Sequence, residues 1–315
     1  MQVKHFLLVP FTGLGLHNGY RGDAWLKNRI EIFKRFTLQS ILNQTDKDFV
    51  VWVCWRREEN SNPIVAEFIK YLMQFDVYFF HTFHGIPFWD DKYDDETASK
   101  RLMDTLRGSL FELYPIVGDE RVLLTIYPSD DMYISTAMAQ VKEALKGDKT
   151  NRSAGWKHGY IMNYATKEIA EYSTHGWKTD HISTYHTDTI PPFFTILFSK
   201  DEFLDPEKHY RHIGPYKSHE FIADFTEYTE LEGKGFVVGC HGENISTTYN
   251  HRYKGRTLTK EETDSILVDT GTWHSEKIML RLSPRMRIRQ LINKVPFSNL
   301  LKKMYYLLPG KYRII

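Results

Sequence analysis

The sequence predicts an α/β fold built on a mostly parallel sheet with helices on both faces. Short apolar runs rich in β-branched and aromatic residues recur along the chain, for example at residues 49–55 (FVVWVCW) and 122–127 (VLLTIY). Longer runs with apolar residues at helical spacing, such as residues 25–42, lie between them. Several short runs are apolar almost throughout, as strands buried on both faces are. Strands that alternate with helices in this way form parallel sheets.

The composition indicates a globular protein of one large or two small domains. The chain has 315 residues, of which 42% are hydrophobic and 15% aromatic, and its formal net charge is +1. This balance excludes a disordered or polyanion-coating chain. The only cysteines are Cys54 and Cys240, so we expect a reducing compartment and no disulfide framework. The start lacks a signal-peptide pattern and no run is long enough to span a bilayer, so we expect a cytoplasmic protein.

The first strand is expected over residues 5–11 (HFLLVPF), where Pro10 ends it. The glycine-rich loop that follows lacks the lysine and spacing of a P-loop, and it matches a dinucleotide fingerprint poorly. The loop would let the backbone approach a ligand, with Arg21 as an anion contact; a flexible surface loop is the alternative. The next expected elements are a helix over residues 25–42, a strand over 49–55, a helix over 63–75 and a strand over 77–80.

An acidic segment is expected to begin the following helix, which runs to Tyr114. Asp94, Asp95 and Glu96 fit the cap and first turn of that helix, because they lack the alternate spacing of a calcium loop. On the same helix Arg101 is a candidate for holding a diphosphate, as are Lys100 and Arg107. A solvated helix face is the alternative.

Residues 120–133 (ERVLLTIYPSDDMY) are the centre of the functional prediction. A buried strand must end at Pro128, which cannot donate to a sheet ladder, and Ser129, Asp130 and Asp131 then leave the sheet edge together. Adjacent carboxylates repel each other unless a cation lies beside them. Mg²⁺ or Mn²⁺ would suit their oxygens, and ligands bind at the carboxyl ends of strands in open α/β sheets. A solvated turn or a helix cap is the alternative.

The second half of the chain offers a histidine in a similar position. A helix is expected over residues 134–145, a less regular stretch rich in Trp, Tyr and His over 147–192, a strand over 193–198, and a helix over 217–225. The aromatic stretch would suit a sugar acceptor pocket. A buried strand over 236–240 then delivers His241. If the two strand ends converge, His241 would complete the coordination of the metal; as a lone histidine it is more often a structural residue.

The chain from residue 277 to 315 contains no Asp or Glu. Its basic and apolar residues alternate in a pattern that suits an anionic membrane surface. A helix that packs back on the domain with a basic outer face is the alternative. We expect no nucleic-acid binding, because no DNA- or RNA-binding motif accompanies the charge.

Three of these segments together resemble the glycosyltransferase A (GT-A) fold, and more closely the rhamnosyltransferase family of bacterial polysaccharide clusters. They are residues 35–49 (RFTLQSILNQTDKDF), Ser129-Asp130-Asp131, and residues 241–246 (HGENIS). The resemblance covers residues 1–250 in order and spacing. Residues 126–129 differ from the Arg-Leu-Asp-like lead-in of that family. The resemblance implies a Rossmann-related GT-A catalytic domain over residues 1–275, followed by a basic amphipathic extension over 276–315.

The resemblance also implies a reaction. A nucleotide-diphosphate sugar would donate its sugar to a glycan or a lipid-linked acceptor, with peripheral membrane contact through residues 277–315. Asp131, Asp130 and His241 would hold Mn²⁺ or Mg²⁺. An inverting transferase needs a carboxylate base, for which Glu220 is the first choice and Asp224 the second, on the expectation that a helix start at Glu220 faces the cleft. The residues expected to contact the donor are Pro10, Phe11, Arg21, Arg101, Ser129 and Asp130.

Two other classes of function stay open. A non-catalytic carbohydrate-binding or assembly protein would keep the fold without the chemistry. A nucleotidyltransferase also uses a metal-binding aspartate pair on an α/β sheet, but the missing Lys-bearing phosphate loop after the first strand counts against it.

Overall fold

Four parallel strands form one half of the larger sheet. The computed structural model describes residues 3–14, 22–86, 94–118, 121–147, 149–173, 190–213, 219–241, 244, 249–250 and 253–275. Strand β1 (Val3–Val9) pairs with both β2 (Val50–Arg56) and β4 (Arg121–Ile126), and β3 (Tyr78–Gly85) lies outside β2. In the order β3-β2-β1-β4, strands β2 and β3 lie on one side of β1, and the next strand, β4, lies on its other side. The strand order thus reverses at β1, although all four strands run in the same direction. In such sheets ligands bind outside the carboxyl ends of the strands at this reversal.

The sheet continues beyond β4 with strands of mixed direction. Strand β9 (Phe194–Phe198) runs antiparallel to β4 and to β6 (Arg152–Gly155), and β10 (Glu227–Glu230) runs parallel to β6. Among the described residues the full order is β10-β6-β9-β4-β1-β2-β3. The predicted α/β architecture, a mostly parallel sheet flanked by helices, is therefore confirmed, with one antiparallel strand, β9, between β4 and β6.

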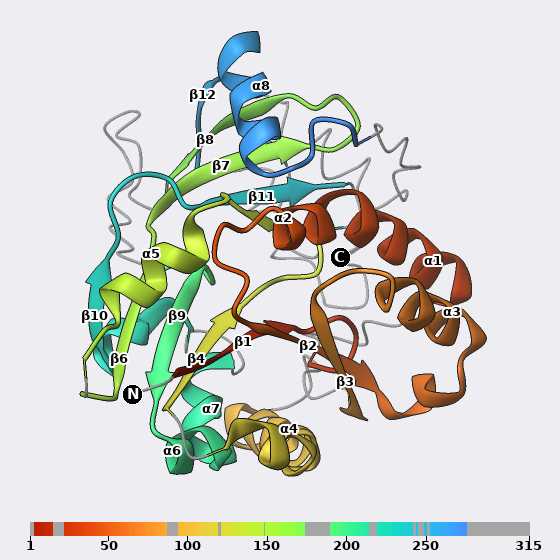
Figure 1. Ribbon diagram of the computed structural model, residues 1–315, viewed down its shortest axis with the longest axis vertical. Helices are drawn as coiled ribbons and strands as arrows, with labels where there is room; N and C mark the ends of the chain where they lie inside the picture. The colour runs from red at the N-terminus through yellow and green to blue at the C-terminus, as the bar shows by residue number, and fades with distance from the viewer. Residues whose placement is uncertain are drawn as a thin grey trace.

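Helices cover both faces of this sheet (Figure 1). One face carries α3 (Pro63–Leu72) and a continuous helix made of α1 (Asp23–Ile32), the π-helical turn η1 (Phe33–Thr37) and α2 (Leu38–Leu42). The other face carries α4 (Asp95–Val117), α6 (Lys200–Leu204) and α7 (Pro206–Ile213). Side chains that alternate along β1 and β2 point into the two separate hydrophobic cores beneath these helices. This alternation explains why the strands read as apolar throughout.

A second sheet lies beside the first, at the top of Figure 1. In the described part of the chain its order is β12-β8-β7-β11-β5. Strand β5 (Met132–Tyr133) follows β4 after only the turn at residues 127–131, and it pairs with β11 (Phe236–Cys240). That turn therefore joins the two sheets and brings the carboxyl end of β11 close to the carboxyl end of β4. The remaining members are β7 (His158–Asn163), β8 (Ile169–Ser173) and β12 (Lys254–Thr257), with α8 (Lys260–Asp269) alongside. Helix α5 (Ala137–Ala144) contacts β6 of the larger sheet.

Several sequence-based expectations need correction. The stretch 147–192, expected to be irregular, contains β6, β7 and β8 in its described part. The helix expected over 217–225 is the short 3₁₀ helix η3 (His219–Asp224). The aromatic residues between 174 and 189, the acidic segment 87–93 and the extension 277–315 lie outside the described residues. No helix among those described is long and apolar enough to cross a membrane.

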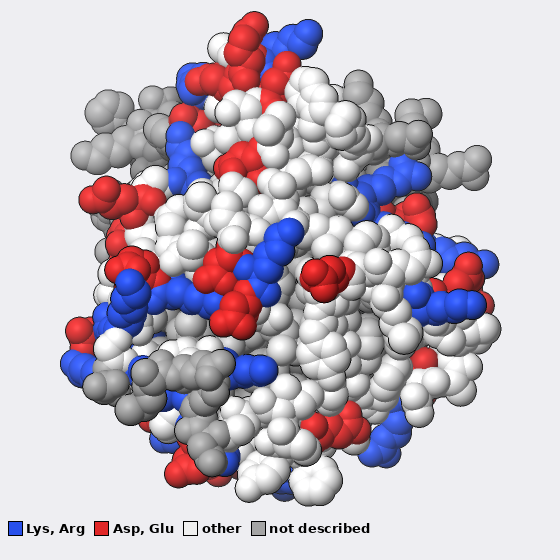
Figure 2. Space-filling model, in the orientation of Figure 1, with Lys and Arg blue, Asp and Glu red and all other residues white. Residues whose placement is uncertain are grey.

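Charges of both signs are mixed over the face seen in Figure 2. Lys and Arg side chains lie beside Asp and Glu side chains along the outline, with uncharged area between them. This mixing agrees with the near-zero net charge of the chain. A surface of this kind does not concentrate a polyanion by its field alone.

Candidate functional site

A nearly buried cluster of polar side chains lies just beyond the carboxyl end of β4. Asp130 is at its centre, in the turn that joins the two sheets, and its side chain is only 13% exposed. Arg29 reaches it from α1, His241 from the end of β11, and Asn244 from three residues further on. The cluster stands where the strand order of the larger sheet reverses, which is the expected place for a ligand.

Arg29 makes the main ion pair of the cluster. Its Nη1 donates to Oδ2 of Asp130 over 2.8 Å, and its Nε donates to Oγ of Ser129 over 3.0 Å. The guanidinium therefore holds two adjacent residues of the turn with two different nitrogens, and its side chain is 17% exposed. An arginine fixed at two points has little rotational freedom left, so its charge is well positioned.

His241 and Asn244 complete the shell around the same oxygen. Nε2 of His241 lies 2.9 Å from Oδ2 of Asp130 and 2.9 Å from Nη1 of Arg29. Asn244 donates from Nδ2 to Oδ2 of Asp130 over 3.2 Å and to the carbonyl of Gly239 over 2.6 Å, and its Oδ1 accepts from the backbone N–H of His241 over 2.8 Å. These contacts fix the orientation of the Asn244 amide, because its nitrogen meets two acceptors and its oxygen meets a donor.

The helix that carries Arg29 is anchored against the turn by its own neighbours. Phe36, in the π-helical turn, stacks on Tyr164 with ring centroids 3.7 Å apart, and Ser40 shares a hydrogen bond with the Tyr127 hydroxyl. Tyr164 in turn donates to the backbone carbonyl of Asp130 over 2.7 Å. The π turn shifts the helical register, and such turns are frequent at functional sites. Here it belongs to a helix that contacts the turn directly at Arg29 and Ser40, and through Tyr164 at Phe36.

Asp131 turns away from Asp130 toward the second sheet. Its Oδ1 accepts the backbone N–H of Gly239 over 2.8 Å, and the residue is 9% exposed. Gly239 is required there, since a Cβ would stand 2.1 Å from the carbonyl oxygen of Asp130 and 2.3 Å from the Tyr164 hydroxyl. The two adjacent carboxylates therefore serve different partners, and Asp131 ties the turn to β11.

The electrostatics of the two carboxylates differ accordingly. Burial acts to raise the pKa of Asp130, but the charge of Arg29 and the hydrogen bond from His241 outweigh it and hold that pKa well below its usual range. Burial, followed by the negative charge of Asp130, raises the pKa of Asp131 well above its usual range. Asp130 is thus the carboxylate that stays ionised, and Asp131 is the one that more readily holds a proton.

The arrangement does not fit a divalent ion at Asp130. Its Oδ2 already accepts from three side chains, and the nitrogens of Arg29 and Asn244 that donate to it have no lone pair to offer a metal. In the described part of the chain, no group of three or more His, Cys, Asp or Glu side chains is placed to hold a metal ion. The Mn²⁺ or Mg²⁺ expected from the sequence stays a prediction, and the cation seen beside Asp130 is Arg29.

The other residues expected to contact the donor are spread out. Phe11 is 4% exposed, and its ring centroid lies 4.5 Å from that of Trp55, so its side chain belongs to the core. Pro10 follows the end of β1 and is half-buried. Arg101 lies on α4, which covers the face of the sheet opposite α1. Arg21 is outside the described residues. Of this set, the structure brings Ser129 and Asp130 together with His241.

Of the two candidate bases, Asp224 lies away from this edge of the sheet. Strand β10 runs in the same direction as β4, and its first residue, Glu227, is level with Leu123 near the amino end of β4 through the pairs Glu227–Arg152, Arg152–Leu197 and Leu197–Leu123. Asp224 precedes Glu227 and is exposed, so it lies toward the edge opposite Asp130. Glu220 is in the same 3₁₀ helix, and its side chain is outside the described part of the structure. The expectation that this segment faces the cleft is wrong for Asp224.

Sequence reasoning missed Arg29, Asn244 and Gly239. Arg29 is one of several basic residues on a helix, and only its distance from Asp130 distinguishes it. Asn244 lies in the segment 241–246 that carries the resemblance, so that segment was a usable signal for it. In the sequence Gly239 looks like an ordinary strand glycine. Only the folded structure shows why a glycine is needed there, because Asp130 and Tyr164 leave no room for a Cβ.

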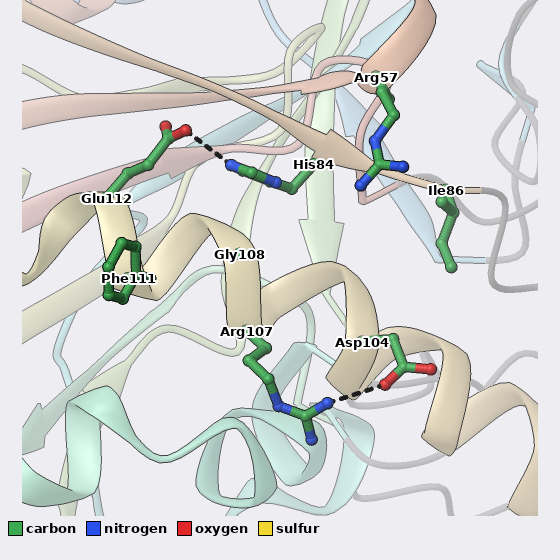
Figure 3. A pocket seen from close by; sticks show the side chains of 8 residues that line it. All are labelled: Arg57, His84, Ile86, Asp104, Arg107, Gly108, Phe111 and Glu112. Carbon is green, nitrogen blue, oxygen red and sulfur yellow. Dashed lines mark hydrogen bonds and ion pairs between the residues drawn. The ribbon is translucent and has the colours of Figure 1, made fainter.

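Away from this cluster, a hollow opens between the end of β3 and α4, with a volume of about 680 Å³ (Figure 3). Two pairs of polar side chains face each other there: Nε2 of His84 lies 2.7 Å from Oε1 of Glu112, and Arg107 donates to Asp104 over 3.1 Å. Their side chains are 28% to 69% exposed. The lining residues are Arg57, His84, Ile86, Asp104, Arg107, Gly108, Phe111 and Glu112.

Comparison with known proteins adds no identity to this geometry. No protein-family model matches the chain. No curated protein matches its sequence.

Proposed function

We propose that this protein is a glycosyltransferase of the GT-A type, which moves a sugar from a nucleoside-diphosphate donor to a hydroxyl of a glycan or lipid-linked acceptor. The observation that carries the proposal is the Arg29–Asp130–His241–Asn244 cluster beyond the end of β4. Rhamnose as the transferred sugar, and surface polysaccharide as the product, rest on the sequence resemblance alone.

Two physical arguments support the proposal. Taking a carboxylate and a guanidinium out of water costs free energy that their attraction only partly returns, so a nearly buried pair is weak evidence for stability. A perturbed carboxylate at a sheet edge is, in contrast, a candidate functional group. The edge concerned is the reversal of a Rossmann-like strand order, where nucleotides and similar ligands bind.

The proposed reaction assigns a role to each member of the cluster. The acceptor hydroxyl oxygen forms a bond to the anomeric carbon and gives up its proton to solvent, while the bond from that carbon to the diphosphate oxygen breaks and the diphosphate leaves with the electron pair. Negative charge grows on the leaving diphosphate, and a fixed cation such as Arg29 would stabilise it. Asp130 holds Arg29 in place and offers its carboxylate to hydroxyls of the donor. His241 and Asn244 orient Asp130.

One observation favours a non-catalytic carbohydrate binder as the second candidate. Asp224, a residue expected to act as the base, lies toward the opposite edge of the sheet. A protein without a base at the site would bind a sugar without transferring it. The two candidates differ in whether a nucleotide binds.

The test is the binding of UDP, GDP and dTDP, each with and without Mn²⁺, measured by isothermal titration calorimetry. We expect one nucleotide to bind the wild type. We expect Asp130→Asn to weaken that binding by about tenfold or more, because the change unpairs Arg29. Asp224→Asn, the same change at an exposed position away from the cluster, is the matched control and should bind like the wild type.

Folding of each variant is checked by its thermal unfolding midpoint. If none of the nucleotides binds the folded wild type under either condition, the transferase proposal fails and the carbohydrate binder is favoured. Equal weakening by Asp224→Asn and Asp130→Asn would place the nucleotide elsewhere.

A further inference from the structure

The cation that neutralises Asp130 comes from the chain itself. Arg29 contacts Asp130 through Nη1 over 2.8 Å and Ser129 through Nε over 3.0 Å. The sequence expectation of a divalent ion rested on the mutual repulsion of Asp130 and Asp131. In the structure each carboxylate meets a donor of the protein itself: Asp130 faces Arg29, and Asp131 faces the backbone N–H of Gly239.

We propose that Arg29 takes the place of the divalent ion, so that the site binds its diphosphate ligand without metal. The ligand part of this inference rests on the function proposed above, whereas the exclusion of metal does not. The substrate class it names is a nucleoside diphosphate sugar bound as the free anion rather than as its Mn²⁺ or Mg²⁺ complex.

The hydrogen-bond geometry around Asp130 is the first support. A divalent ion bound to a carboxylate sits about 2.0–2.6 Å from the oxygen. Oδ2 already accepts from Arg29, His241 and Asn244. A metal ion on that oxygen would have to displace the guanidinium, and in a nearly buried site it would then repel it strongly.

The remaining hydrogen-bonding capacity of Arg29 is the second support. A guanidinium presents donors on three nitrogens in a fixed plane. Nε and Nη1 are engaged in the cluster, and Nη2 has no hydrogen-bond partner among the described residues. With a side chain 17% exposed, Arg29 is not sealed off from solvent. An arginine held by two residues with a third nitrogen free suits recognition of a phosphate oxygen.

The decisive experiment titrates Mn²⁺ into the full chain without nucleotide and follows the electron paramagnetic resonance signal of free Mn²⁺. We expect wild type to bind no Mn²⁺ that depends on Asp130, and Arg29→Met to gain affinity by about tenfold or more, since removal of the guanidinium frees the carboxylate. Adding Asp130→Asn to Arg29→Met should abolish the gain. Lys27→Met removes one positive charge from an exposed position of the same helix and should behave like wild type.

A second measurement needs no variant and so does not depend on Arg29→Met folding. The binding of the preferred nucleoside diphosphate to wild type is compared in EDTA and in Mn²⁺. We expect the two affinities to agree within about twofold.

Each outcome bears on one of the two proposals. Wild-type Mn²⁺ binding that Asp130→Asn abolishes would overturn the inference, as would a folded Arg29→Met that gains no affinity for Mn²⁺. A nucleotide that binds only with Mn²⁺ would overturn the inference and leave the transferase proposal standing. If no nucleotide binds while Arg29→Met alone admits Mn²⁺, the arginine inference stands and the transferase proposal fails.

Discussion

Charged side chains meet in two regions of this molecule, and the two settings differ sharply. Beyond β4, Arg29 and Asp130 are 17% and 13% exposed, and further side chains converge on the same oxygen. In the hollow between β3 and α4, Arg107 and Asp104 are 69% and 51% exposed, and Glu112 is 42% exposed. Removing one partner of a buried pair leaves an uncompensated charge, whereas exposed partners are solvated by water.

The comparison teaches where function is to be sought. The hollow opens to the surface, but its exposed ion pairs contribute little to the stability of the fold. The cluster beyond β4 is nearly buried, and its side chains are positioned by both sheets and by the helix that carries Arg29. The following predictions test this contrast, from the largest expected effect to the smallest.

Breaking the ion pairs should separate the two regions most clearly. Arg29→Met should lower the free energy of unfolding by about 3 kcal/mol, because it leaves Asp130 buried without its cation. Arg107→Met in the hollow should change it by less than about 1 kcal/mol. Urea unfolding followed by tryptophan fluorescence measures both. Equal effects of the two changes would remove the distinction drawn here between the two ion pairs.

Two glycines provide a matched test of packing. A Cβ on Gly239 would stand 2.1 Å from the backbone carbonyl of Asp130, which cannot move without displacing the turn. Gly239→Ala should therefore cost about 2 kcal/mol or more. A Cβ on Gly108 would stand 2.4 Å from Nδ1 of His84, the end of a partly exposed side chain that can shift at the cost of its contact with Glu112. The helix gains about 1 kcal/mol from Gly→Ala, so Gly108→Ala should be close to neutral.

Thermal and urea unfolding of both alanine variants decide the matter. A Gly108→Ala variant that loses as much stability as Gly239→Ala would mean that the hollow is as rigidly built as the cluster.

Acid should reduce the difference between wild type and Arg29→Met. The pKa of Asp130 is held below its ordinary value by Arg29 and His241. A carboxylate whose folded-state pKa is lowered stabilises the fold above its unfolded pKa, about 3.9 for Asp, and this stabilisation is lost as the pH falls through the folded value. The difference in unfolding free energy should therefore be full at neutral pH and shrink below about pH 4.

Urea unfolding of both proteins at a series of pH values measures this difference. The contributions of groups that titrate alike in wild type and variant cancel when the two unfolding free energies are subtracted. A difference that stays constant into strong acid would show that Arg29 stabilises the fold through packing of its aliphatic part.

The central architecture was predictable from sequence because it depends on local patterns. The apolar runs that form β1, β2, β3 and β4 predict buried strands. The helically spaced apolar residues of 25–42 predict the helix that ends with α2, and Pro63 predicts the start of α3. The strands β6, β7 and β8 were missed because they mix small, polar and aromatic residues without a clear apolar run. Pairing with distant strands holds them: β6 pairs with β9 and β10 in the larger sheet, and β7 and β8 pair in the second sheet.

The candidate site was predictable only in part. Asp130 and His241 could be found, since each follows a buried strand and strand ends meet at a sheet edge. Arg29 could not, because a helix of ordinary composition carries it and its partner is encoded far away. The position of Asp224 could not be predicted for another reason: strand β10, which begins three residues after it and runs in the same direction as β4, was not expected from the sequence.

The distances along the chain between members of the cluster have a consequence for how the protein folds. Arg29 and Asp130 are 101 residues apart, and Asp130 and His241 are 111 apart. Contacts of such long range close large loops, and chains dominated by them fold slowly. During synthesis the Asp130 carboxylate emerges with Arg29 already made but His241 still to come. We therefore expect the complete cluster to form late, once both sheets have docked.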